Sequence, residues 1–246
     1  MRLKEFLIFS FMFVVIVSCE KNTANSADAA STGKGGSMAR FTIAANHLYL
    51  ADYNTIEVYD ISGGTATKKT SVQVDWGVET IFPYKDKLFI GSVNGMFIYS
   101  IADPSNPVKL GSALHVRSCD PVVADDKYSY VTLRGSGTCG AAEDGLYIYD
   151  ITDVLKPKQL SLLRLQSPYG LGMKDSVMFV CRASNGLTAV NVKDPSNPKV
   201  MYTVKDGNFI DVIPIDQLLI CYVLNGILLY DASDPGKIVK LGNMNY

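Results

Sequence analysis

A pattern of about 40 residues repeats five times between residue 37 and the C-terminus of this 246-residue chain. Each copy contains an apolar run, a second run that ends on a small residue, a third that is usually led by glycine, and a fourth. A period near 40 residues with four strands per unit is the signature of a β-propeller, in which each unit forms one blade. The repeat therefore predicts an all-β fold, a five-bladed β-propeller with four antiparallel strands per blade and almost no helix.

The third strand and the turn that follows it are the most regular parts of the repeat. The five copies of the third strand span residues 55–61, 95–101, 145–151, 186–192 and 226–232. Four copies then turn through an aspartate, and Asp-Pro-Ser-Asn-Pro occurs unchanged at residues 103–107 and 194–198. Proline fixes φ and lacks an N–H, and aspartate caps the turn, so this element ends one strand and starts the next. We interpret these turn residues as structural.

The first 37 residues have the composition of an export signal followed by a tether. Arg2 and Lys4 precede an apolar stretch at residues 6–17, which is too short to span a bilayer as mature structure. Residues 16–19, Ile-Val-Ser-Cys, resemble a bacterial lipobox, and this resemblance implies a signal peptide at 1–18 and a lipid on Cys19. The alternative is an ordinary secreted protein in which Cys19 is incidental. Residues 19–37 are small and polar, which predicts a flexible tether before a propeller at 38–246.

Charge excludes some classes of partner. Without the leader the net charge is about −2, so the chain has no basic field for nucleic acid or anionic lipid. The chain contains only two histidines, and no glycine-rich phosphate loop leads into a helix. We expect no cofactor, no resident metal and a monomer that meets the membrane only through its anchor.

The glycine-led strand Gly-Leu-Tyr-Ile-Tyr-Asp-Ile at 145–151, together with Asp-Pro-Ser-Asn-Pro, resembles the LVIVD-repeat proteins, many of which are bacterial lipoproteins. The resemblance covers residues 37–246, and the segments 118–123, 169–172 and 211–214 fit it as well. It implies a lipid-anchored propeller of the cell envelope, with the outer membrane as the expected location and either its periplasmic or its surface side as the setting. It implies no reaction, because a propeller hosts many functions.

The cysteines fall into two groups. Cys181 and Cys221 end second strands at positions that align with Ala51, Gly91 and Thr132, so we interpret them as small buried hydrophobic residues. Cys119 starts an inner strand, and Cys139 lies in an insertion at residues 134–144 of the same blade. The meander places both on one face of the propeller, and an exported chain meets an oxidising compartment, so we predict a Cys119–Cys139 disulfide. Two free thiols are the alternative.

That same face also provides the best candidate for a binding site, because the starts of the innermost strands converge on the axis. The aligned starts are Arg40, Glu79, Asp120, Gly170 and Asp211, and the residues near them in sequence are Trp76, His115, Arg117, Tyr169 and Asn208. Three carboxylates in one funnel could bind a cation, an amine or the hydroxyls of a sugar, with aromatic rings stacking beneath. Alternatively, the acids only pair with neighbouring arginines and backbone amides at the channel mouth.

Two functions of different class follow from this site. The first is a non-catalytic module that presents its loop face to a protein or glycan partner. The second is a small-ligand or carbohydrate-active site that uses Glu79, Asp120 and Asp211, and it requires two of these carboxyls within about 9 Å of each other. The repeats also predict how the ring closes. Since no strand is shared between the ends, closure should depend on side-by-side packing of the first and fifth blades.

Overall fold

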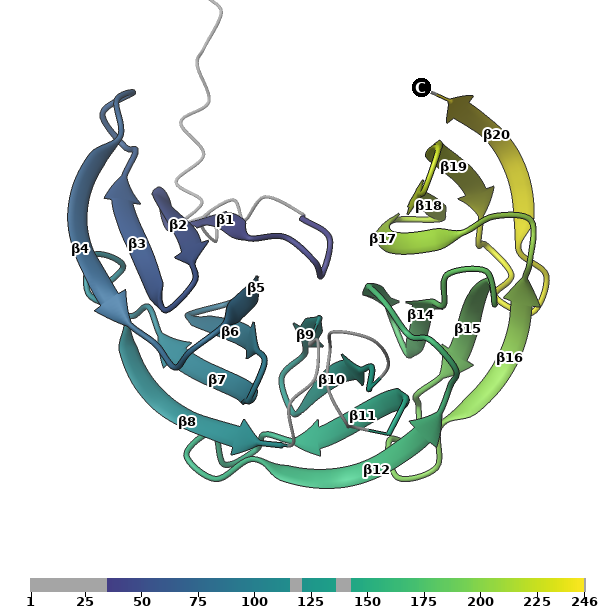
Figure 1. Cartoon of the computed structure of the whole chain (residues 1–246), viewed down its shortest axis with the longest axis horizontal. Helices are drawn as coiled ribbons and strands as arrows, with labels where there is room; N and C mark the ends of the chain where they lie inside the picture. Colours follow the sequence, from purple (N-terminus) through teal and green to yellow (C-terminus); the bar gives the residue numbers. More distant parts are fainter. Residues whose placement is uncertain (1–34, 116–120, 136–142, 246) are drawn as a thin grey trace, which may run out of the picture.

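The computed structural model describes residues 35–115, 121–135 and 143–245, and all regular structure in these ranges is β-strand. Twenty strands form five separate four-stranded sheets, which confirms the predicted five-bladed β-propeller (Figure 1). The first blade consists of β1 (Phe41–Ala44), β2 (His47–Asp52), β3 (Thr55–Asp60) and β4 (Thr67–Gln73). The second blade consists of β5 (Val78–Tyr84), β6 (Lys87–Ser92), β7 (Gly95–Ser100) and β8 (Val108–Leu114). The third blade consists of β9 (Val122–Ala124), β10 (Tyr128–Leu133), β11 (Gly145–Asp150), β12 (Lys158–Arg164). The fourth blade consists of β13 (Leu171–Lys174), β14 (Val177–Cys181), β15 (Leu187–Asn191) and β16 (Lys199–Val204). The fifth blade consists of β17 (Phe209–Ile215), β18 (Leu218–Val223), β19 (Gly226–Asp231) and β20 (Val239–Asn245).

Each blade is a simple antiparallel meander in which neighbouring strands are consecutive in sequence. The pairing of the third and fourth strands shifts by one residue at the same place in every blade, for example between Val58 and Tyr59 in the first blade. Such a β-bulge increases the local twist of a strand. The outer strands therefore curve around the molecule, as the arc formed by β4, β8, β12, β16 and β20 in Figure 1 shows.

The core consists of four apolar clusters, one between each pair of consecutive blades. The cluster between the fourth and fifth blades contains Phe179 and Cys181 from β14 together with Phe209 and Cys221 from β17 and β18. Alternate residues of an inner strand point to opposite faces of its sheet, so an internal blade contributes to two clusters. Burial of these apolar faces against each other stabilises the contact between consecutive blades.

The Asp-Pro turns are structural, as expected, and they also join blades. The Asp103 carboxylate accepts hydrogen bonds from Ser105 N at 3.0 Å and from Asn106 Nδ2 at 2.8 Å. The preceding blade contacts the same turn, because the Tyr49 hydroxyl donates to Pro104 O at 2.9 Å. The fourth blade repeats this contact, where the Ser161 hydroxyl of the preceding blade donates to Pro195 O at 2.6 Å.

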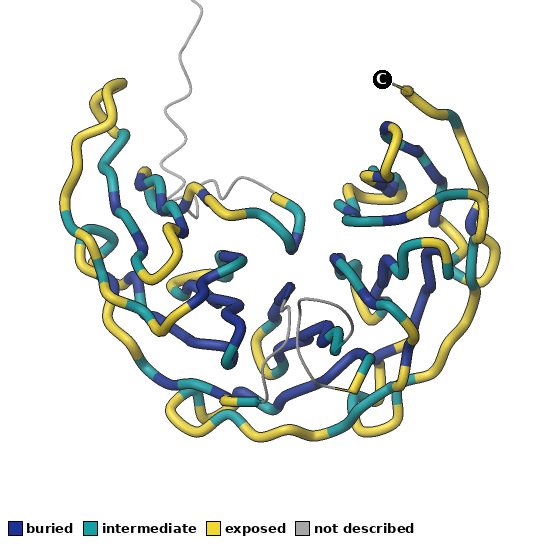
Figure 2. Tube along the Cα trace, in the orientation of Figure 1, coloured by how far each residue is buried: buried dark blue, intermediate teal, exposed yellow. Residues whose placement is uncertain are grey.

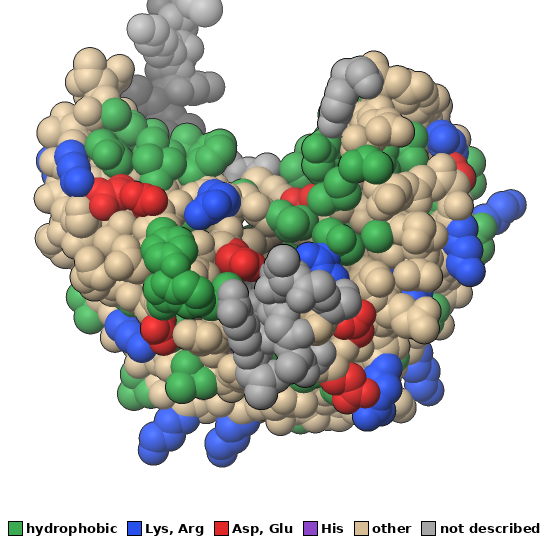
Figure 3. All heavy atoms as spheres, in the orientation of Figure 1, with side chains coloured by type: hydrophobic (Ala, Val, Ile, Leu, Met, Phe, Trp, Pro, Cys, Tyr) green, Lys and Arg blue, Asp and Glu red, His purple; other side chains and the backbone are tan. Residues whose placement is uncertain are grey.

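The predicted closure of the ring is wrong. No apolar cluster of the described residues joins the first blade to the fifth, and the space-filling view shows a wide opening between them (Figure 3). We call this open sector the notch. The five blades thus form an arc around the axis rather than a closed ring, and buried residues line the inner part of the arc while its rim is exposed (Figure 2).

The small residues at the ends of the second strands are buried, as predicted. Cys181, Cys221 and Thr132 have no exposed surface, and Ala51 is almost fully buried. Cys181 and Cys221 are free thiols, and burial raises the pKa of both well above the ordinary value for cysteine. Reactive cysteines have lowered pKa values, so these two are packing residues.

Candidate functional site

The segment before β1 provides the link that the blades themselves do not make. Residues 35–40, which we call the strap, lead from the axis into the first blade. Ala39 O accepts a hydrogen bond from Ile81 N of β5 at 2.9 Å, and Arg40 O accepts one from Ala51 N of β2 at 2.7 Å. Ser37 is buried, with 1% of its surface exposed. Residues 35–37, which composition assigned to the tether, therefore take part in the packing of the propeller.

Asp211 of β17 holds the strap to the fifth blade. Its carboxylate accepts hydrogen bonds from the Ser37 hydroxyl at 3.1 Å, from Met38 N at 3.2 Å and from its neighbour Val212 N at 2.9 Å. Ser37 Oγ in turn accepts a hydrogen bond from Leu171 N of the fourth blade at 2.7 Å. This network joins the first blade to the fourth and fifth blades across the axis.

Two glycines make room for this contact. A Cβ atom at Gly36 or at Gly170 would overlap the Asp211 carboxylate. Since only glycine lacks a Cβ, the strap and the start of the fourth blade can approach the carboxylate closely at these two positions. Gly170 N also donates to Ile210 O at 2.9 Å, which keeps the inner edges of the fourth and fifth blades together.

Burial of its carboxylate raises the pKa of Asp211 from 3.8 to about 6, although its hydrogen bonds act in the opposite direction. The folded pKa lies above the unfolded one, so the stability that this group contributes is complete below pH 3.8 and is lost as the pH rises to about 6. We expect the free energy of unfolding of the wild type, relative to Asp211→Asn, to fall by about 2–3 kcal/mol between pH 4 and pH 7. Denaturant unfolding at several pH values measures this difference.

Asp231→Asn is a matched control for this titration. Asp231 is partly exposed and accepts a hydrogen bond from Ser233 N, which lowers its pKa. Its contribution to stability is therefore lost at low pH, in the opposite sense to that of Asp211. A pH dependence that is the same for the wild type and Asp211→Asn would contradict the buried position of this carboxylate.

A cavity of about 300 Å³ opens beside the strap, on the face to which the inner strands bring their starts. Its lining includes three of the predicted site residues, Arg40, Glu79 and Tyr169. The sequence did not single out Met38 or Arg134, which also line it. The Arg134 guanidinium lies over the Tyr169 ring at 3.7 Å from the ring centre, a cation–π contact between the third and fourth blades. The sequence could have indicated Arg134, because it is the first residue of the insertion at residues 134–144.

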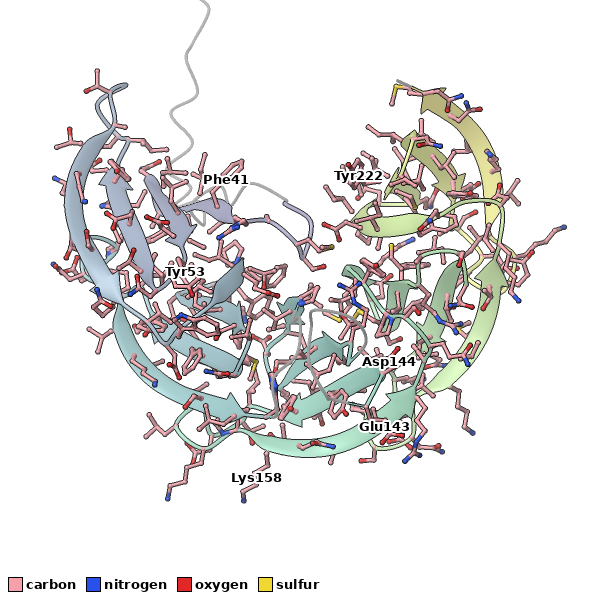
Figure 4. All side chains as sticks on the ribbon, in the orientation of Figure 1. Phe41, Tyr53, Glu143, Asp144, Lys158 and Tyr222 are labelled. Carbon is pink, nitrogen blue, oxygen red and sulfur yellow. The ribbon has the colours of Figure 1, made fainter. Side chains whose placement is uncertain are left out.

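The base of this insertion is tied to the propeller on both sides. Asp144 Oδ1 accepts a hydrogen bond from Gly135 N at 2.9 Å, and Asp144 Oδ2 accepts one from Ser167 N at 2.8 Å. Glu143 forms an ion pair with Arg164 of β12. Figure 4 labels both acids, which lie at the foot of the insertion near β11. The insertion thus starts and ends at fixed points next to the cavity.

The other predicted site residues lie elsewhere. Asp211 does not line the cavity, because its carboxylate binds the strap. Trp76 is half-exposed and contacts Tyr53 edge to face, with ring centres 5.5 Å apart. His115 follows β8, and its backbone N–H donates to Asn94 O at 3.1 Å; it is not part of the cavity lining. Arg117, Cys119, Asp120, Cys139 and Cys19 lie outside the described residues, so the disulfide, the lipidation and the role of Asp120 stay predictions.

A second cavity, of about 280 Å³, lies on the opposite side of the strap. Gly35 and Ser37 line it, whereas Met38 and Arg40 line the first, so the strap separates the axial space into two parts. Its walls are mostly apolar, with Phe82 and Leu171 among them. Over the described residues, no group of three histidine, cysteine, aspartate or glutamate side chains comes together as a metal site would require.

Comparison with known proteins supports the fold and gives no family. No family model matches the chain, and no curated protein matches it. Among solved structures, it is similar to a protein from Lactobacillus plantarum, with a TM-score of 0.65 and 14% identity over 82% of this chain and 69% of that one. It is also similar to a Bacteroides uniformis protein provisionally named 6-phosphogluconolactonase, with a TM-score of 0.65 and 14% identity over 83% of this chain and 70% of that one. The computationally designed protein Ika8 matches with a TM-score of 0.59 and 14% identity, over 83% of this chain and 60% of that one.

At these identities the likeness concerns the fold alone. The chain spans less than two thirds of the length of the designed protein Ika8, and about 70% of the two natural ones. Fold, strap and cavity together define the class of this protein as an open five-bladed β-propeller with an axial cavity on its loop face.

Proposed function

We propose that this protein is a membrane-anchored lipoprotein of the cell envelope whose propeller is a non-catalytic interaction module for a protein or glycan partner. The observation that carries the proposal is the lining of the axial cavity. It holds Arg40 and Arg134, the ring of Tyr169, and Glu79 as its only carboxylate among the described residues. Guanidinium groups bind carboxylates and phosphates in a planar, two-pronged geometry, and an aromatic ring packs against the flat face of a sugar or a side chain. Such a lining suits recognition of an acidic group on a partner.

The alternative, a carbohydrate-active site with Glu79, Asp120 and Asp211, is less well supported. Asp211 accepts three hydrogen bonds in the strap network, so it acts as a structural group and does not face the cavity. Acid–base hydrolysis of a glycoside needs two carboxyl groups that flank the bond to be broken. Of the two acids that the structure describes, Glu79 lines the cavity and Asp211 does not, while Asp120 lies outside the described residues.

The anchor part of the proposal comes from the leader and Cys19. The described residues form no helix long and apolar enough to cross a membrane. Cys19→Ala should move the protein from the membrane pellet to the soluble fraction of lysed cells, because the lipid would have no attachment point. A protein that stays in the pellet after this change would contradict the lipid anchor but not the binding module.

Affinity capture from native envelopes tests the binding module. We expect Arg134→Ala and Arg40→Ala each to lower the recovery of a specific partner by tenfold or more, which corresponds to a loss of about 1.4 kcal/mol of binding free energy. Lys158→Ala is the matched control, since it removes an exposed positive charge from β12 at the rim (Figure 4). Circular dichroism and thermal unfolding of each variant check that the fold is retained. Equal recovery with all three variants would locate the binding face elsewhere and overturn the proposal.

A further inference from the structure

The second cavity lies on the face where the innermost strands end, and its walls carry no charge. β5, β9, β13 and β17 surround the axis in Figure 1, and each contributes two or three consecutive residues to the lining. Among the residues that the structure describes, no charged side chain lines this cavity, whereas Arg40, Arg134 and Glu79 line the first one. The two cavities therefore suit ligands of different chemistry.

Two prolines make the backbone of this wall less polar. The innermost strand of a blade is a sheet edge, so it turns unpaired N–H and C=O groups toward the axis. Proline has no N–H, and within a sheet it is tolerated at such an edge. Pro83 of β5 and Pro214 of β17 each occupy the sixth position of a seven-residue strand, and both line the cavity. The wall thus lacks a backbone donor at two places where water or a polar ligand could bind.

The shape of the second cavity is set by the packing of the blades. A Cβ atom at Gly172 of β13 would overlap the Pro214 ring of β17, so glycine permits these two inner strands to meet. Val123 and Leu171 of the lining belong to the cluster between the third and fourth blades, and Val212 belongs to the cluster between the fourth and fifth. These side chains are held by the core, so the cavity is a fixed part of the fold.

The hydroxyl groups in the lining offer little to a polar ligand. Ser37 Oγ already donates to the Asp211 carboxylate and accepts from Leu171 N. Tyr84 supplies the other side-chain hydroxyl, and burial raises its pKa, so it stays neutral. A bound water needs two to four polar partners, and apolar cavities stay dry. An apolar group is therefore the better occupant.

The size and the opening of the cavity indicate which apolar group fits it. An apolar cavity of about 150 Å³ is enough to bind benzene, and this one has a volume of about 280 Å³. Its lining is mostly aliphatic and includes the flexible side chain of Met173, which adapts to irregular shapes. The cavity is partly open to solvent, so the end of a ligand at the opening stays in water and must be polar. A molecule with one hydrocarbon chain and a polar head meets both conditions.

We propose that the second cavity binds the acyl chain of a single-chain lipid such as a fatty acid, with the chain between the four inner strands and the polar head at the opening. Ile213 is a central contact, since it lines the cavity, is half-buried and is absent from the four apolar clusters of the described residues. Binding here uses none of the guanidinium groups of the first cavity. The inference is therefore independent of the proposed partner-binding module.

Titration with a fluorescent fatty acid tests the proposal. The protein used is the proposed mature form, residues 19–246, with Cys19→Ala, so that no lipid of its own can occupy the cavity. We expect saturable binding that decanoic acid competes away. Ile213→Asp should weaken the affinity by tenfold or more, because it places a carboxylate among apolar walls. Ile213→Trp should weaken it as well, because the larger ring fills the space that the chain occupies.

Ile215→Asp is the matched control. Ile215 lies two residues further along β17 than Ile213, so its side chain is on the same face of the strand. It is 37% exposed and does not line the cavity. We expect this variant, and Arg134→Ala in the first cavity, to bind the fatty acid as the parent does. Circular dichroism and thermal unfolding check that each variant is folded.

The outcomes separate the possible occupants of the second cavity. Equal affinities of the parent and both Ile213 variants, or no saturable binding by the parent, would overturn the proposal. Competition by an aromatic compound but not by decanoic acid would assign the cavity to an aromatic ligand and overturn it too. A dimer in sedimentation that dissociates with Ile213→Asp would assign the cavity to a second copy of this chain, with the same consequence. None of these results bears on partner capture through Arg40 and Arg134.

Discussion

Replacing Phe179 with alanine should lower the free energy of unfolding by about 3–5 kcal/mol, because it empties a fully buried position between two blades. Phe179 packs with Leu187 of its own blade and with Phe209 and Cys221 of the next. The loss combines the transfer free energy of the ring with the cost of the cavity left behind. Urea unfolding followed by tryptophan fluorescence or circular dichroism measures it.

Tyr222→Ala is the control for this prediction. It removes a ring of similar size from the next blade, but from the half-exposed side chain in the notch. We expect a loss of about 1 kcal/mol or less, mainly through the lower β-propensity of alanine. Equal losses for Phe179→Ala and Tyr222→Ala would show that the outer face of the fifth blade is as well packed as the inner one, which the open arc does not allow.

Ser37→Ala should lower the free energy of unfolding by about 2–3 kcal/mol, a large effect for the loss of one hydroxyl group. The hydroxyl donates to the Asp211 carboxylate and accepts from Leu171 N, so its removal leaves a backbone donor and a carboxylate each with one partner fewer. The same change should raise the pKa of Asp211 above that of the wild type, because the bond from Ser37 favours its ionised form. Unfolding curves and a titration of the Asp211 carboxyl by nuclear magnetic resonance measure the two effects.

Ser129→Ala makes the same chemical change at another buried serine. Ser129 has no exposed surface, and its hydroxyl has no hydrogen-bond partner among the described residues. Removing a buried polar group without a partner is close to neutral or stabilising. If both alanine variants changed the stability by the same amount, the strap would not depend on the bonds of Ser37.

The sequence predicted the parts of the fold that repeat. Five copies of one strand pattern predicted the number of blades. The Asp-Pro turns and the small residues aligned with Cys181 each recur in equivalent positions, and this recurrence predicted that they are structural. Arg40, Glu79 and Tyr169 were also found together, since the starts of inner strands converge on the axis in any propeller.

The sequence did not predict the features that occur once. The strap is a single short segment, residues 35–40, that begins inside the small polar stretch assigned to the tether. Nothing in it indicates that Ser37 meets a carboxylate 174 residues away. Asp211 was therefore assigned to the cavity instead of to the strap. The open ring was missed for a related reason. Repeats specify how each blade packs on the next, but the angle between blades, and so whether five of them close a circle, depends on details of side-chain packing that the repeat does not encode.

The most direct test of the open arc is a comparison of two distances by pulsed electron spin resonance. Lys69, Met201 and Leu241 occupy the same bulged position on the outer strands of the first, fourth and fifth blades. Spin labels are attached through cysteines at 201 and 241, across adjoining blades, or at 69 and 241, across the notch, with the unsubstituted protein as the background. The open arc predicts a clearly longer distance for the 69–241 pair than for the 201–241 pair. Equal distances would mean that the first and fifth blades adjoin like any other pair, and they would contradict both the open arc and the strap as the link between its ends.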